Sequence, residues 1–380
     1  MPPFFYTAYD QFSAFDPPCT VPQLVLQAGL NLGLQPFIAN AWGQLEVVDY
    51  EGHLLPLVLP EIHAQNTYVC SPLGHYVRYA RRELELELSQ EPLLKSGLDV
   101  MVQGLGRIFE SLDFDNVVYV NNWLLSTNLY PNLPLNGLHD LHQALCARYP
   151  QRAIVFRSLN PAHHQPLMDR LQQLGYQSVF SRQVYLLDPQ QGAHERTSAL
   201  KKDRRLARKS PFVWCGAETI TLNEVPRLKQ LYTQLYVGKY SPLNPQFTEL
   251  FFREALHKRW LNFYVMRHRD THRIEAVVGY FQCQGIMTTP IIGYNPELPP
   301  QAGLYRLISL FLADEAKRQG LVLHRSSGAS QFKRLRGNLP VFEYNWVYTR
   351  HLPLSRRLPW QTLEQLSRGL IEPLMTRFEL

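Results

Sequence analysis

The chain has 380 residues, which is enough for about two domains of ordinary size. Hydrophobic residues make up 45% and charged residues 18%, so the composition predicts a buried core and excludes a disordered chain. Its charge of +6 comes from 38 Lys and Arg against 32 Asp and Glu.

Three classes of protein are disfavoured before any element is assigned. The five cysteines lie far apart without a CxxC pair, which argues against a disulfide scaffold and a structural zinc site. Residues 1–12 lack the basic start and apolar core of a secretory signal. The uncharged stretch 17–45 holds too many amides and prolines for a membrane span. We therefore expect a cytoplasmic protein that binds no metal and has no membrane span.

The excess charge is concentrated in one segment. Seven of the 38 basic residues and one of the 32 acidic residues lie in 196–209, so the rest of the chain carries 31 of each sign. A general nucleic-acid binder spreads basic residues over a whole face, which this chain does not.

The hydrophobic pattern of the first half predicts alternating strands and helices. Strands are expected at 37–42, 44–50, 54–59, 116–121, 153–158 and 178–187, and helices at 92–111, 137–149 and 166–174.

The second half repeats this layout. Helices are expected at 225–236, 247–260 and 303–319, and strands at 262–268, 274–283, 286–294, 321–326 and 342–350.

The two halves also share a short motif. The strand after each central helix ends in Arg-Ser, at Arg157-Ser158 and at Arg325-Ser326, and the strand before that helix ends in Asn. A duplicated mixed α/β unit explains this economically. Chance similarity of two generic α/β halves is the alternative.

These observations predict two domains, 1–190 and 211–380, and a basic helical connector at 191–210. Lys201, Arg204, Arg205 and Arg208 are spaced to lie on one face of the connector helix. That face is either solvated or the binding edge for an anionic partner, such as cofactor phosphates, an acidic carrier protein or an RNA stem.

Familiar catalytic motifs are absent, and the strongest signal is the strand, loop and helix of 286–319. This segment resembles the core of the GNAT acyltransferase superfamily, and GASQFKRLRG at 328–337 resembles a glycine-bounded Phe-Lys element of Fem-type and other tandem GNAT proteins. The resemblance implies two tandem GNAT-like domains of mixed α/β sheets. It also implies an acyl-CoA or acyl-carrier-protein thioester as donor, and an amine of a peptide or small metabolite as acceptor.

The resemblance implies a set of site residues in the second half. Donor contacts are expected from Thr289, Ile291, Ile292, Gln301, Ala302, Gly303, Leu304 and Arg306. Catalytic candidates are His324 as base and Tyr294 or Tyr305 as acid, and the alternative for His324 is a structural role as a core histidine. Substrate contacts are expected from Lys239, Tyr240, Asn244, Ser326 and Lys333.

The phosphate-binding loop departs from the family pattern, because only Gln301-Ala302-Gly303 remains of it. Weak binding of free coenzyme A is therefore expected. The leading hypothesis is an N-acyltransferase, and it includes two options: a fatty acyl group, and an acyl carrier protein that binds at the connector. The alternatives are a Fem-type transferase that uses aminoacyl-tRNA and an inactive acyl-binding module.

Overall fold

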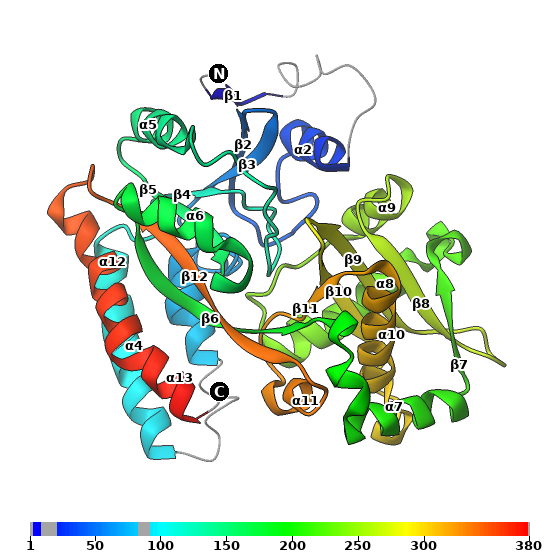
Figure 1. Cartoon of the computed structure of the whole chain (residues 1–380). Coiled ribbons are helices and arrows are strands. Elements are labelled where there is room, and N and C mark those ends of the chain that lie inside the picture. The colour runs from blue at the N-terminus through cyan, green and yellow to red at the C-terminus, as the bar shows by residue number, and fades with distance from the viewer. Residues whose placement is uncertain (1–2, 9–20, 83–91, 379–380) are drawn as a thin grey trace. The chain divides into compact units, whose positions relative to one another are not determined.

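The computed structural model describes residues 3–8, 21–82 and 92–378. The described chain divides into two compact units (Figure 1). Unit 1 contains residues 1–182, 241–246 and 342–380, and unit 2 contains residues 183–240 and 247–341. The division falls at Arg182, inside a strand, and residues 342–380 return to unit 1, whereas the sequence suggested one break near 191–210.

The sheet of unit 1 has the strand order β1-β2-β3-β4-β5-β12. Neighbouring strands are antiparallel except β4 and β5, which are parallel. The strands are β1 (Phe4–Tyr6), β2 (Gly43–Tyr50), β3 (His53–Pro60), β4 (Val117–Val120), β5 (Ala153–Leu159) and β12 (Leu339–Tyr348).

The core of unit 1 is formed by sheet residues and the apolar sides of α5 (Leu138–Arg148) and α6 (Pro161–Gln173). Asn160 caps α6 by accepting the His163 N–H, and Pro161 follows at the first helical position. The other helical segments are α2 (Val21–Leu32), η1 (Gly74–Tyr79), α4 (Pro92–Ser111), α12 (Leu354–Leu366), η8 (Ser367–Ile371) and α13 (Glu372–Phe378).

The sheet of unit 2 has the equivalent order β7-β8-β9-β10-β11-β6. Here too the pairs are antiparallel except one, β10 with β11, and the helix α10 joins these two parallel strands. The strands are β6 (Gln177–Leu187), β7 (Phe212–Gly216), β8 (Asn262–His268), β9 (Ile274–Cys283), β10 (Ile286–Tyr294) and β11 (Val322–His324).

Helices pack closely on the sheet of unit 2. The main cluster combines strand residues with the apolar side of α10 (Leu304–Gln319) and Leu206 of α7 (Ser198–Lys209). A Cβ on Gly293 of β10 would lie 2.6 Å from the backbone of Leu231 in α8 (Val225–Thr233), so only glycine permits this approach. The other helical segments are η2 (Pro189–Gln191), η3 (Ala193–Arg196), η4 (Ala217–Thr219), η5 (Leu222–Glu224), η6 (Gln234–Tyr240), α9 (Glu249–His257), η7 (Pro300–Ala302) and α11 (Ser330–Arg334).

The repeated strand order shows two mixed α/β units of equivalent topology, so the duplicated mixed α/β fold that the sequence predicts is confirmed. The shared Arg-Ser motif has a structural counterpart, because Ser158 and Ser326 both have left-handed backbone, with φ of 63° and 54°. Each unit is also completed by a strand from the opposite half of the chain, β12 in unit 1 and β6 in unit 2.

Most expected elements are confirmed, and the bounds of α4, β8, β9 and β10 agree to the residue. The strand expected at 37–42 is wrong. This segment forms turns, and the Asn40 amide group donates to the carbonyl oxygens of Pro242 and Asn244 at 3.1 and 3.0 Å. The polar side chain serves a turn here, although its neighbours have strand-forming side chains.

No helix within the described ranges is long and apolar enough to cross a bilayer.

Candidate functional site

The site of unit 2 begins where two parallel strands part. β10 pairs with β11 only from Ile286↔Val322 to Thr288↔His324. Beyond this point the chain after β11 follows β6, since the Arg325 N–H donates to Tyr185 O at 2.8 Å and the Tyr185 N–H to Ser326 O at 3.2 Å. β10 continues to Tyr294 along β9, with a register shift between Thr288 and Ile291. The segment after β11 and the strand β10 therefore diverge towards the carboxyl end of β10.

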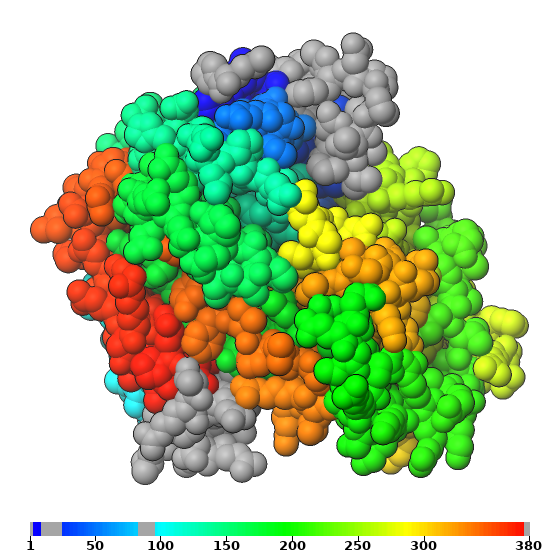
Figure 2. Space-filling model, viewed as in Figure 1, coloured from blue at the N-terminus to red at the C-terminus, as the bar shows by residue number. Residues whose placement is uncertain are grey.

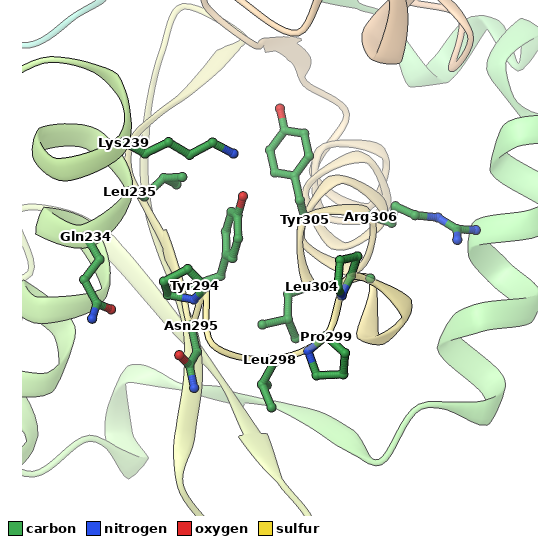
Figure 3. A pocket seen from close by; sticks show the side chains of 13 residues that line it. Gln234, Leu235, Lys239, Tyr294, Asn295, Leu298, Pro299, Leu304, Tyr305 and Arg306 are labelled. Carbon is green, nitrogen blue, oxygen red and sulfur yellow. The ribbon is translucent and has the colours of Figure 1, made fainter.

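A cavity of about 370 Å³ lies at that end of β10 (Figure 3). Its walls come from η6, from the carboxyl end of β10 with the loop that follows, and from the first turn of α10. The lining residues are Gln234, Leu235, Lys239, Tyr294, Asn295, Pro296, Leu298, Pro299, Pro300, Gly303, Leu304, Tyr305 and Arg306.

The amino end of α10 supplies free hydrogen-bond donors to this cavity. Gly303 is the N-cap residue with φ of 63°, and no side chain caps the helix. The first helical bond runs from the Leu307 N–H to Gly303 O at 3.0 Å, so the N–H groups of Leu304, Tyr305 and Arg306 have no acceptor within the helix. An uncapped helix start favours an anionic group.

Two tyrosines and one lysine provide the polar side chains of the cavity. The rings of Tyr294 and Tyr305 lie 6.2 Å apart, and Figure 3 shows the Lys239 ammonium directed towards both. Burial raises the pKa of both phenols, so they stay protonated at neutral pH. Tyr305 also packs on Phe332, at 4.7 Å between ring centres.

Arg306 lines the cavity, but its guanidinium is directed away from it (Figure 3). Its Nε donates to Oδ1 of Asp203 in α7 at 2.6 Å. Arg336 binds the same carboxylate through Nε at 2.6 Å and Nη2 at 3.1 Å. Asp203, the single acid of the basic segment, is fully buried between these two cations.

Lys333 of the Phe-Lys element binds backbone carbonyl oxygens. It is buried, and its ammonium donates to the carbonyl oxygens of Arg325, Ser326 and Ser327 at 2.8, 3.1 and 2.7 Å. These three bonds use every donor of the group and hold Ser326 in its left-handed conformation. The structure thus places Lys333 as a clamp on the turn that leads the chain away from β10.

His324 lies on β11 and is buried, outside the cavity lining. Its neighbours Leu323 and Arg325 face α10: Leu323 belongs to the cluster with α10, and Arg325 donates to Ser309 Oγ at 2.7 Å. Because side chains alternate along a strand, His324 faces the opposite side of the sheet. Its Nδ1 accepts the Ser326 N–H at 3.2 Å.

The structure brings together six of the residues named from the sequence, at one cavity: Lys239, Tyr294, Gly303, Leu304, Tyr305 and Arg306. The others lie outside its lining. Ile291 is fully buried, Gln301 and Tyr240 are exposed, and Asn244 belongs to unit 1, where its Nδ2 donates to Ser241 O. The remaining five are Thr289, Ile292, Ala302, Ser326 and Lys333, and the last two form the clamped turn.

Sequence reasoning missed the η6 wall of Gln234 and Leu235, and it missed Asp203. A lone acid in a basic run is a usable signal for a buried ion pair, whereas Gln234 and Leu235 carry no such signal, although Lys239 of the same segment was expected at the site.

The counterpart turn of unit 1 is held by buried hydrogen bonds. Arg157 corresponds to Arg325, is buried, and donates to Val69 O and Asn122 Oδ1, both at 3.1 Å. The Tyr130 hydroxyl donates to the Arg157 carbonyl oxygen at 2.7 Å.

No family model matches the chain, and no curated protein matches it in sequence. Solved structures do match. FemX has 8% identity, with 86% of this chain and 91% of that chain covered and a TM-score of 0.48. L-PGS from Bacillus licheniformis has 13% identity, 67% and 83% coverage and a TM-score of 0.45. A tandem GNAT protein from the clavulanic acid biosynthesis pathway has 13% identity, 92% and 99% coverage and a TM-score of 0.41.

Tandem GNAT and Fem-type proteins, which the sequence resembles, are thus among the structures to which the chain is similar. With TM-scores below 0.5, these likenesses carry no conclusion about donor, acceptor or site residues.

Proposed function

We propose that the protein is an N-acyltransferase that moves an acyl group from a thioester to an amine, with the donor arm held in the cavity of unit 2. One observation carries the proposal. The parallel strands part after Thr288 and His324, and a cavity with an uncapped helix start lies at the carboxyl end of the strand that continues.

The reaction forms a C–N bond and breaks a C–S bond, and the proton lost by the amine ends on the thiolate. The acyl carbonyl oxygen gains negative charge on the way and needs a donor. The hydroxyls of Tyr294 and Tyr305 are protonated at neutral pH and lie at one cavity, so we assign them to the oxyanion and the leaving sulfur.

The remaining cavity groups suit the ends of a donor arm and an acceptor. The free N–H groups of Leu304 to Arg306 fit a phosphate. Leu235, Leu298 and Leu304 supply apolar wall for the arm. Lys239, which has no ion pair within the described residues, fits an anionic group on the donor or the acceptor.

The test is intact-mass analysis of an amine panel incubated with the protein and acyl-CoA, acyl-pantetheine and acyl-carrier donors. We expect one amine class to gain the acyl mass. Tyr305→Phe should lower kcat by about 10²-fold, the low end for a lost proton donor. Tyr264→Phe is the matched control, since Tyr264 lies on β8 outside the cavity lining.

Absence of transfer from every thioester would contradict the proposal. Transfer from aminoacyl-tRNA alone would assign the cavity to the Fem-type reaction instead.

A further inference from the structure

One face of α7 has no role in the fold. Its inner side holds the buried Leu200 and Asp203. The outer side presents five exposed cations, at Lys201, Lys202, Arg205, Arg208 and Lys209. We call these five residues the α7 stripe, and Figure 2 shows α7 at the surface of unit 2.

The positive charges of the α7 stripe are not paired with acidic side chains within the described residues. Arg204 was expected on the same face, but it binds Glu195 at 3.0 Å and Asp314 at 2.9 Å. None of the five stripe residues has such an ion pair in the described part of the chain. Like charges four residues apart, such as Lys201 and Arg205, repel each other on a helix face. A row of exposed like charges that packing does not require is available for a binding role.

α7 also adjoins the cavity directly. Asp203 holds Arg306 of the cavity lining, and a Cβ on Gly303 would lie 2.4 Å from the Leu206 side chain. The inner side of α7 therefore positions the helix start that faces the cavity, while its outer side carries the stripe.

The cavity suits one phosphate better than the nucleotide of coenzyme A. Its volume of about 370 Å³ is near the lower limit of ordinary ligand pockets, about 300 Å³. Its lining has two cations, and the Arg306 guanidinium binds Asp203 and is directed away from the cavity, which leaves Lys239. A phosphopantetheine arm has a single phosphate diester, whereas coenzyme A brings a diphosphate and a third phosphate.

We propose that the donor is the phosphopantetheine thioester of an acidic carrier protein, and that this protein docks on the α7 stripe. The inference rests on the proposed acyl transfer and adds the partner and its docking surface. A small acidic protein fits better than RNA, because the stripe covers one helix face and the chain outside 196–209 carries 31 charges of each sign.

The test compares two donors with the same acyl group: a purified acidic acyl carrier protein in its acylated holo form, and free acyl-pantetheine. The variant is Lys201→Gln/Arg205→Gln/Arg208→Gln. The matched control removes three exposed arginines elsewhere in unit 2, as Arg253→Gln/Arg259→Gln/Arg269→Gln. Both variants are checked for an unchanged melting midpoint, because substitutions of exposed side chains rarely alter stability.

At low ionic strength the stripe variant should raise the KM for the carrier donor at least about tenfold, and leave the KM for acyl-pantetheine unchanged. The control variant should change neither KM. The difference should shrink in high salt, as expected for contacts between exposed charges.

An unchanged KM for the carrier donor at low salt would overturn the inference, as would a higher kcat/KM for acyl-CoA than for the acylated carrier. If the stripe variant instead loses salt-dependent binding of aminoacyl-tRNA while the KM for the carrier donor stays unchanged, the α7 stripe is an RNA-binding surface. Turnover of acyl-pantetheine without preference for the carrier refutes only this inference. No turnover of any thioester refutes the proposed function.

Discussion

His324 was a candidate base because a histidine near a thioester site has a suitable pKa range. Its place on β11 favours a structural role. The ring is 2% exposed, lies outside the cavity lining, and accepts the Ser326 N–H through Nδ1. It thereby helps to hold the turn that Lys333 clamps.

We expect His324→Ala to lower the melting midpoint and to leave kcat within about tenfold of the parent. Truncation of a buried side chain removes packing and a hydrogen bond, at a typical cost of a few kcal/mol. The measurement is kcat and thermal unfolding of the same preparation. A fall in kcat of about 10²–10⁴ with an unchanged midpoint would restore the general-base role.

At the scale of elements, η1 places a histidine in the interior of unit 1. His75 stacks on Tyr76 at 4.6 Å between ring centres, and its Nε2 lies 3.4 Å from Ser181 O. Burial, with the charges of Arg157 and Arg182, lowers the pKa of His75 to about 3, although Glu343 acts in the opposite direction. The folded protein therefore keeps this ring neutral under conditions that protonate it in the unfolded chain.

The sign of the pH dependence follows from this difference. Between about pH 6.5 and 3 the unfolded chain binds a proton at His75 that the folded chain does not, so stability falls as the pH falls. The contribution is about 1.4 kcal/mol per pH unit well inside that window. His142, His194 and His351 have lowered pKa values too and act in the same direction.

We expect His75→Gln to reduce the slope of unfolding free energy against pH by about 1.4 kcal/mol per pH unit between pH 5 and 6, which corresponds to one proton. Urea unfolding at several pH values measures it. An unaltered slope in the His75 variant would show that this ring titrates normally in the folded protein.

At the scale of the whole molecule, each unit depends on a strand from the other half of the sequence. β12 pairs with β5 from Tyr344↔Leu159 to Tyr348↔Ile154 and brings the buried Trp346 and Val347 into unit 1. α12 adds Trp360, whose ring lies 4.4 Å from that of Phe114. Residues 342–380 are therefore part of the unit 1 core.

The fragment 1–190 should consequently fail to fold alone, because β5 would expose its hydrogen-bonding edge and its apolar side chains. Addition of a peptide of residues 342–380, in trans or through a flexible linker, should restore a cooperative thermal transition. Circular dichroism of the fragment with and without the peptide measures this. A cooperative transition of 1–190 that the peptide does not change would contradict the strand exchange.

Most local elements and the duplication follow from the order of residues along the chain. The uncharged run of β10, the helical spacing of α4 and the turn between β8 and β9 are properties of neighbouring residues, so their bounds follow from periodicity. The repeated Arg-Ser pair likewise pointed to two equivalent turns, and both serines have left-handed backbone.

Tertiary structure alone decided which unit each segment completes and which side chains remain available. Lys333 and Arg306 look like ligand-binding cations in the sequence, but Lys333 binds backbone carbonyl oxygens and Arg306 binds Asp203. These partners are 6 to 8 residues away for Lys333 and 103 residues away for Arg306. A buried charge must find a partner wherever the fold provides one, and no periodicity records which partner that is.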